Sequence, residues 1–173
     1  MDIHIRQEHA EDFSTVCSLV KDAFANVEQS EGDEQNVVER LRQSEGFVPG
    51  LSLVAECDGK IVGHILFTII KIGMEDSLIL APVSVLPAYQ RMGIGSLLIK
   101  KGHQIAKELG FSSAVLVGHP TYYPRFGYRR ASKWGIQLSI PAPDECFMAV
   151  ELVPGSLDSA GGNVIVLPPA FGL

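Results

Sequence analysis

The sequence predicts a mixed α/β fold built around one partly parallel sheet. Strand-like runs alternate with amphipathic helical stretches along the chain, a pattern typical of this fold class. The 173 residues, 46% of them apolar, suffice for one domain with a buried core. An apolar strand ending near Leu86 passes through a short glycine-containing loop into a helix, as in a β–α unit.

The N-terminal half supplies a strand, two helices and three further strands. Apolar residues recur at helical spacing from Glu8 to Phe24, and again at Val37, Val38 and Leu41. The dipeptide Asp58-Gly59 favours a two-residue hairpin turn between two strands. The expected elements are a strand at 3–6, a helix at 8–24, a second helix that ends before Gly46, and strands at 51–56, 60–72 and 78–86.

The C-terminal half begins with a helix whose buried stripe is expected to include Leu98 and Leu109. An aromatic segment follows, and a short helix is expected within it. The expected elements are a helix at 93–109, a strand at 113–117, the aromatic segment at 119–128, and strands near 135–140 and 145–153. Without a linker or repeat, we expect one domain over residues 1–153, with a tail at 154–173 that packs on it.

Composition argues against several classes of partner. A formal net charge of −6 without a basic cluster disfavours binding to nucleic acid or to an anionic membrane. No apolar run reaches 18 residues, and the first six residues do not resemble a signal peptide. Cys17, Cys57 and Cys146 share no metal-ligand spacing, and we expect Cys17 and Cys57 to be buried thiols. These features predict a cytoplasmic protein without a metal.

The most informative motif is Gln90-Arg91-Met92-Gly93-Ile94-Gly95, which links the strand before Pro87 to the following helix. Two positions without side chains let backbone N–H groups close around an anion, and the helix N-terminus favours negative charge there. No lysine follows Gly95, as a nucleotide-hydrolysing P-loop requires. Leu98 stands where a dinucleotide fingerprint has its third glycine. The motif therefore predicts a different pyrophosphate cradle.

This Gln-x-x-Gly-x-Gly pattern resembles the acyl-CoA pyrophosphate loop of the GNAT superfamily of N-acetyltransferases. The order of elements through about residue 152 is similar to the GNAT fold, whose central sheet is split. Tyr-Tyr-Pro-Arg-Phe-Gly-Tyr at 122–128 and the tail motif Pro-Pro-Ala-Phe-Gly resemble a bacterial group of the YhbS type. The resemblance implies transfer of an acetyl group from acetyl-CoA to a primary amine of a small molecule or protein, by direct attack through a tetrahedral intermediate.

The resemblance also assigns roles around the cradle. It implies that the backbone of Val85 pairs with pantetheine and that the Val83 N–H polarises the acyl carbonyl, an oxyanion-type role. Side-chain contacts to the cofactor are expected from Gln90 and Arg91. Backbone N–H contacts to the pyrophosphate are expected from Met92, Gly93, Ile94, Gly95 and Ser96, and the last can add its hydroxyl.

Protonation of the departing thiolate requires an acid. Tyr123 lies four residues before Gly127, where the superfamily carries its acid tyrosine, and a phenol remains protonated at pH 7. Tyr122 is adjacent and stays an alternative. The sequence departs from many relatives at Gly118-His119-Pro120, where they carry an asparagine.

The general base, the acceptor and some alternatives stay open. His64 fits a buried core histidine better than a base, and the acidic segment before the second helix is accounted for by helix-start effects. In GNAT proteins that segment borders the acceptor site, which would favour a cationic acceptor. A non-catalytic acyl-CoA sensor and transfer to a hydroxyl or lipid-linked acceptor are the alternative functions, and the tail could cover a sheet edge or join a homodimer. The candidate bases are His64, Glu28, Glu31, Asp33 and His119.

Overall fold

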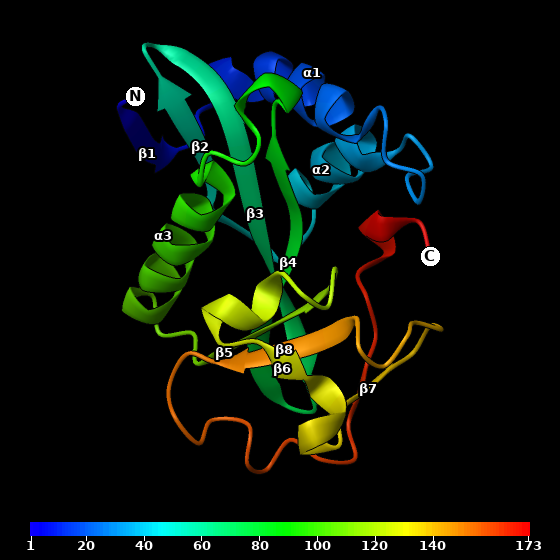
Figure 1. Cartoon of the computed structure of the whole chain (residues 1–173). Helices are drawn as coiled ribbons and strands as arrows, with labels where there is room; N and C mark the ends of the chain where they lie inside the picture. Colours follow the sequence, from blue (N-terminus) through cyan, green and yellow to red (C-terminus); the bar gives the residue numbers. More distant parts are fainter.

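A computed structural model describes all residues 1–173 and shows a seven-stranded mixed sheet flanked by three α-helices (Figure 1). Every neighbouring pair of strands is antiparallel except β4 and β5, which are parallel. The predicted fold class is therefore confirmed. In order across the sheet, the strands are β1 (Ile3–Gln7), β2 (Phe47–Cys57), β3 (Lys60–Ile72), β4 (Glu75–Val85), β5 (Ser113–Val117), β8 (Phe147–Glu151) and β6 (Arg129–Arg130).

The helices cover opposite faces of this sheet. Since alternate residues of a strand face opposite sides, Ile65 and Phe67 of β3 pack with one core cluster and Leu66 with another. The first cluster contains Leu98 of α3 (Ile94–Glu108), and the second contains side chains of α1 (Phe13–Phe24) and α2 (Glu34–Arg42). None of these helices is long and apolar enough to cross a bilayer.

Strands β4 and β5 share only a short stretch of pairing, Leu78 with Ala114 and Ile79 with Val115. Beyond it, β4 carries a bulge, because Ala81 and Pro82 together oppose the single residue Leu66 of β3. The remainder of β4 pairs with β3 but not with β5. One side of its backbone therefore stays free at the centre of the molecule.

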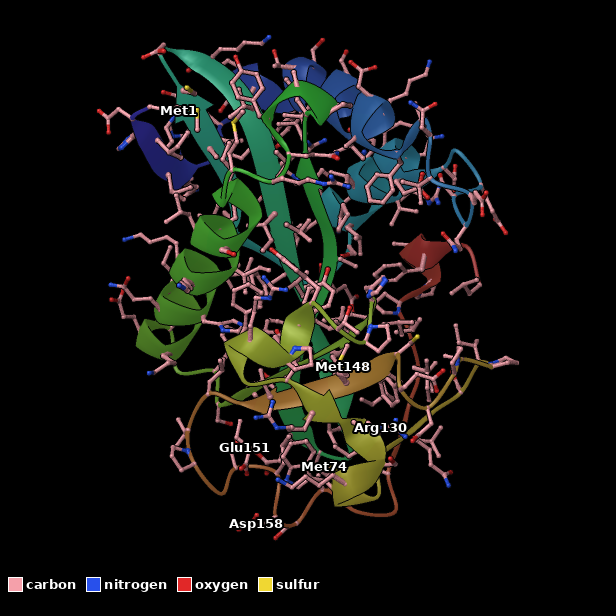
Figure 2. All side chains as sticks on the ribbon, viewed as in Figure 1. Met1, Met74, Arg130, Met148, Glu151 and Asp158 are labelled. Atoms are coloured by element: carbon pink, nitrogen blue, oxygen red, sulfur yellow. The ribbon has the colours of Figure 1, made fainter.

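A two-stranded parallel sheet, formed by β7 (Gln137–Leu138) and β9 (Val164–Ile165), lies beside β3. Figure 2 shows Met74, at the β3–β4 turn, and Met148, on β8, both in the lower half of the view. Met148 is buried, whereas Met74 is exposed. The chain ends in a short 3-10 helix, η5 (Pro169–Phe171), which packs near α2.

Several expectations need correction. Cys17 is exposed, because the buried face of α1 consists of Val16, Leu19 and Val20. Leu109 is also exposed, since the buried face of α3 ends at Ala106. The strands expected near 135–140 and 145–153 are shorter, and β6 and β9 were not expected, because two-residue strands depend on distant partners.

Candidate functional site

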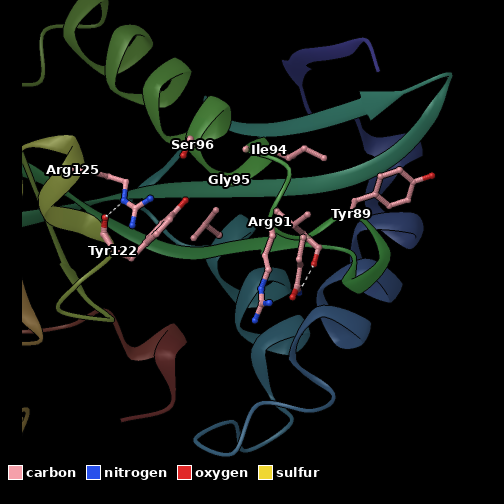
Figure 3. A pocket seen from close by; sticks show the side chains of 11 residues that line it. Tyr89, Arg91, Ile94, Gly95, Ser96, Tyr122 and Arg125 are labelled. Carbon is pink, nitrogen blue, oxygen red and sulfur yellow. Dashed lines mark hydrogen bonds between the residues drawn. The ribbon is translucent and has the colours of Figure 1, made fainter.

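A cavity of about 550 Å³ opens where the free part of β4, the start of α3 and the aromatic segment meet (Figure 3). All residues that the sequence analysis placed around the cofactor line it, except Met92 and Tyr123. Tyr89, Tyr122 and Arg125 complete the wall. The lining residues are Val83, Val85, Tyr89, Gln90, Arg91, Gly93, Ile94, Gly95, Ser96, Tyr122 and Arg125.

The turn into α3 presents backbone donors to this cavity. Gly93 is the N-cap of the helix and has a φ of +83°, a left-handed conformation that glycine adopts without steric cost. The first helical hydrogen bond runs from Leu97 N–H to the Gly93 carbonyl, so the N–H groups of residues 94–96 have no partner inside the helix. These donors and the helix dipole together favour an anion.

The charges around the cavity also favour an anionic ligand. Arg91 and Arg125 are the charged residues in its wall, and no carboxylate lines it. The whole chain, by contrast, carries a formal net charge of −6. The cavity is therefore a local cationic site on an acidic protein, suited to a phosphate-bearing ligand.

The β4 wall offers main-chain groups. Val83 and Val85 line the cavity on the stretch of β4 that has no β5 partner. The Gln90 side chain donates a hydrogen bond from Nε2 to the Val85 carbonyl, 3.0 Å away. This contact ties the turn to the strand end, and the carbonyl keeps a second lone pair for another donor. Gln90 therefore also has a structural contact, which the sequence analysis did not anticipate.

The two tyrosines of the aromatic segment have different surroundings. Tyr122 lines the cavity, and its hydroxyl lies 3.0 Å from the point that a Cβ on Gly95 would occupy. Tyr123 begins the 3-10 helix η3 (Tyr123–Phe126), and its ring packs against Gly118 and, edge-on, against Tyr128. Burial raises the pKa of Tyr123 to about 12, and the neighbouring Tyr122 adds to this.

None of the candidate bases lines the cavity. His64 is fully buried, lies 3.1 Å from the Ser52 hydroxyl, and has its pKa lowered to about 4 by burial, so it is the core histidine that the sequence favoured. Asp33 is the N-cap residue of α2, but its carboxylate binds the side chains of Arg40 and Asn36 instead of capping the helix. Glu28 and Glu31 are exposed. Thr121 Oγ1 lies 3.0 Å from His119 Nδ1.

Besides Tyr89, Arg125 is a cavity residue that the sequence analysis missed. Its position inside the aromatic motif, three residues after Tyr122, was the available signal. The structure has no group of three or more His, Cys, Asp or Glu side chains arranged to hold a metal ion.

Comparison with known proteins finds relatives that are named as acetyltransferases. The model of the acetyltransferase (GNAT) family matches residues 13–128. The uncharacterized N-acetyltransferase YjhQ of Escherichia coli K12 is 39% identical over 136 residues, which cover 74% of this chain and 75% of YjhQ. The uncharacterized N-acetyltransferase YhbS of the same strain is 29% identical over 134 residues, covering 76% of this chain and 79% of YhbS.

Two solved structures extend the likeness to the whole fold. The crystal structure of Escherichia coli YhbS in complex with CoA matches with a TM-score of 0.89 and 25% identity, covering 99% of this chain and 92% of that one. A GNAT family acetyltransferase from Brucella melitensis in complex with acetyl-CoA matches with a TM-score of 0.80 and 32% identity, covering 98% of each chain. The family match over two thirds of the chain and the identity to YjhQ show that this chain belongs to the GNAT family of acetyltransferases.

Proposed function

We propose that the protein transfers the acetyl group of acetyl-CoA to a primary amine of a small molecule or protein, by direct attack of the amine on the thioester. The observation that carries the proposal is the cavity itself, where the free part of β4, the turn into α3 and Tyr122 surround one space. The acetyl-CoA bound in the Brucella relative and the N-acetyltransferase name of YjhQ support the choice of acyl donor and reaction class.

In the proposed reaction, the amine lone pair forms a bond to the thioester carbonyl carbon while the carbonyl electrons move onto oxygen. The backbone N–H of Val83 donates a hydrogen bond to that oxygen, which stabilises the charge that develops there. Collapse of the intermediate breaks the C–S bond and expels the CoA thiolate. A tyrosine phenol protonates the thiolate, and the proton lost by the amine nitrogen returns to the phenolate through solvent.

Two tyrosines are candidates for this acid. Tyr123 has the spacing of the family's acid tyrosine, whereas Tyr122 has its side chain in the cavity wall. The raised pKa of Tyr123 makes its phenol a weaker acid than an ordinary tyrosine, which supports Tyr122. The proposal therefore has two testable versions that differ in one residue.

The test is release of free thiol from acetyl-CoA with a panel of amines, peptides and aminated antibiotics. Wild type is compared with Tyr122→Phe and Tyr123→Phe, and calorimetric binding of CoA to each protein is the control. The variant that removes the acid should lose about 100-fold or more in turnover while keeping its CoA affinity. The other variant should stay near wild type.

Two results would contradict the proposal. Full turnover in both variants would exclude a tyrosine acid. CoA binding without turnover over the whole panel would favour an acyl-CoA sensor over an enzyme that acetylates amines.

A further inference from the structure

Arg125 lines the cavity, and its charge, like that of Arg91 on the opposite element, has no counterpart in the protein. Its Nε donates a hydrogen bond to the Tyr122 carbonyl at 2.8 Å, and its guanidinium carbon lies 4.6 Å from the centre of the Tyr122 ring. Its two Nη groups make no hydrogen bond or ion pair with the protein. Four N–H donors are thus held in place and unused.

The neighbouring Arg129 and Arg130 differ from Arg125, because their Nη groups bind protein atoms. Arg129 donates from Nη1 to the carbonyls of Pro124 and Tyr128, and Arg130 pairs with Asp144 at 3.2 Å. Neither lines the cavity. Arg125 alone among the three combines a cavity position with a free guanidinium face.

Arg125 and the start of α3 approach the cavity from different elements. Figure 3 shows the Arg125 side chain beside Tyr122, with Gly95 and Ser96 on the facing helix. The helix offers backbone N–H groups, and the arginine offers a planar fork that matches two phosphate oxygens at once. A ligand group with negatively charged oxygens on two sides could accept hydrogen bonds from the helix N–H groups and from the Arg125 guanidinium at the same time.

We propose that Arg125 clamps the pyrophosphate of the acyl donor against the N-terminus of α3, and thereby sets a preference for CoA thioesters over thioesters without phosphate. This inference rests on the proposed function in that the donor is an acyl-CoA. The CoA 3′-phosphate shares the same chemistry, but the donors on α3 and the arginine line one cavity, and a pyrophosphate spans both sets.

The test is calorimetric binding to the full chain of four ligands that lose phosphates stepwise: CoA, dephospho-CoA without the 3′-phosphate, 4′-phosphopantetheine and pantetheine. The variants are Arg125→Gln and Arg125→Lys. Arg130→Gln is the matched control, because it removes the same charge from the neighbouring strand β6, outside the cavity. Thermal unfolding of each variant checks that it folds.

Arg125→Gln should weaken CoA and dephospho-CoA equally, by about 10- to 100-fold in Kd, and leave pantetheine unchanged. Arg125→Lys should recover part of the loss, because lysine keeps the charge without the fork. Arg130→Gln should bind all four ligands as wild type does.

Three results would overturn the inference. A loss for CoA that disappears with dephospho-CoA would assign Arg125 to the 3′-phosphate. An equal loss for pantetheine would mean that Arg125 acts through Tyr122 or through folding. Unchanged CoA affinity in Arg125→Gln would mean that the Arg125 side chain does not contact CoA.

Binding is measured without turnover, so the inference and the proposed function fail separately. CoA binding that depends on Arg125 in a protein without acetyl transfer would support the clamp and contradict the enzyme. A wild-type protein that binds none of the ligands would overturn both.

Discussion

Gly93 shows how one backbone conformation shapes the anion site. Its φ of +83° orients the turn whose N–H groups face the cavity, and an added Cβ would meet no atom within 4 Å. Gly93→Ala should therefore cause no steric clash. It should lower the unfolding free energy by about 1 kcal/mol, because a residue with a Cβ disfavours the left-handed conformation. Any relaxation of the turn should also weaken CoA binding. Urea unfolding and calorimetry measure the two effects.

Gly32 provides the matched control. It lies in the loop between α1 and α2, has a φ of +77°, and also has no atom within 4 Å of a built Cβ. Gly32→Ala should lose a similar stability but bind CoA as wild type does. Equal CoA affinity in the two alanine variants would contradict a special role for the Gly93 turn.

Asp12 links acidity to stability through a single side chain. Its carboxylate accepts hydrogen bonds from Arg6 at 2.7 and 3.0 Å and from the His9 N–H at 2.8 Å. These contacts, that of Arg6 above all, lower the pKa of Asp12 from 3.8 to about 2. Because the folded state favours the charged form, this contribution is complete above about pH 4 and is lost as the pH falls toward 2.

The measurement is the urea midpoint as a function of pH. Wild type should lose stability between pH 4 and pH 2 more steeply than Asp12→Asn, which is less stable at neutral pH but has no carboxylate to protonate there. Parallel curves for the two proteins would show that Asp12 is not the titrating group.

The adjacent residues Tyr122 and Tyr123 show what could not be predicted from the sequence. Spacing selects the pair Tyr122-Tyr123, but it does not say which ring enters the cavity. The 3-10 helix η3 begins at Tyr123, and successive side chains of such a helix point about 120° apart. The orientation depends on contacts with Gly95, Gly118 and Tyr128, which are distant in sequence or lie on other elements.

Among the elements, α2 is fixed to the sheet by a buried ion pair. Arg42 Nη2 lies 2.6 Å from Glu8 Oε2, and both side chains are at most 5% exposed. The Ser52 hydroxyl donates to the other carboxylate oxygen at 2.8 Å, and the Arg42 guanidinium lies over the Phe13 ring at 4.0 Å. Glu8→Ala should cost about 3 kcal/mol, because it removes the buried partner of Arg42 and leaves only the exposed Glu39 carboxylate, 3.0 Å from Arg42 Nη1.

An exposed ion pair in the same protein gives a reference for the loss of stability expected in Glu8→Ala. Arg130 and Asp144 are 61% and 55% exposed, so Asp144→Ala should change the unfolding free energy by less than about 1 kcal/mol. Urea unfolding of both variants gives the comparison. A Glu8→Ala loss as small as that of Asp144→Ala would mean that water reaches the Arg42 charge.

Elements set by local chemistry were the ones that sequence could predict. The hairpin at Asp58-Gly59 and the helix that became α3 follow from turn residues and helical periodicity, and both were confirmed. The two-residue strands β6 and β9 depend on pairing with β8 and β7, which periodicity does not encode. The exposed position of Cys17 was missed because its neighbours Val16 and Val20 fit the same helical pattern.

Over the whole molecule, the C-terminal residues join separate parts of the core. Phe171 packs against the cluster around α1 and α2 and also against the cluster that contains β9, and Arg40 donates to the Ala170 carbonyl at 2.8 Å. Phe171→Ala should therefore cost about 2 kcal/mol, below the value for a fully buried phenylalanine because the ring is only half-buried.

Leu173→Ala is the control for the tail. Leu173 is exposed, so its variant should unfold within about 0.5 kcal/mol of wild type. Chemical denaturation distinguishes the two. Equal stability of both variants would show that the tail adds nothing to the core.

The parting of β4 from β5 has a consequence for how the amides of β4 exchange with solvent. A pantetheine arm carries two amide groups, so in this position it would act as a surrogate strand for the free side of β4. Hydrogen-exchange mass spectrometry should then show slower deuterium uptake around Val83 and Val85 with CoA than without it, and no change in the β2–β3 hairpin. The same molecule would then be both the acyl donor and a temporary eighth strand of the protein's sheet.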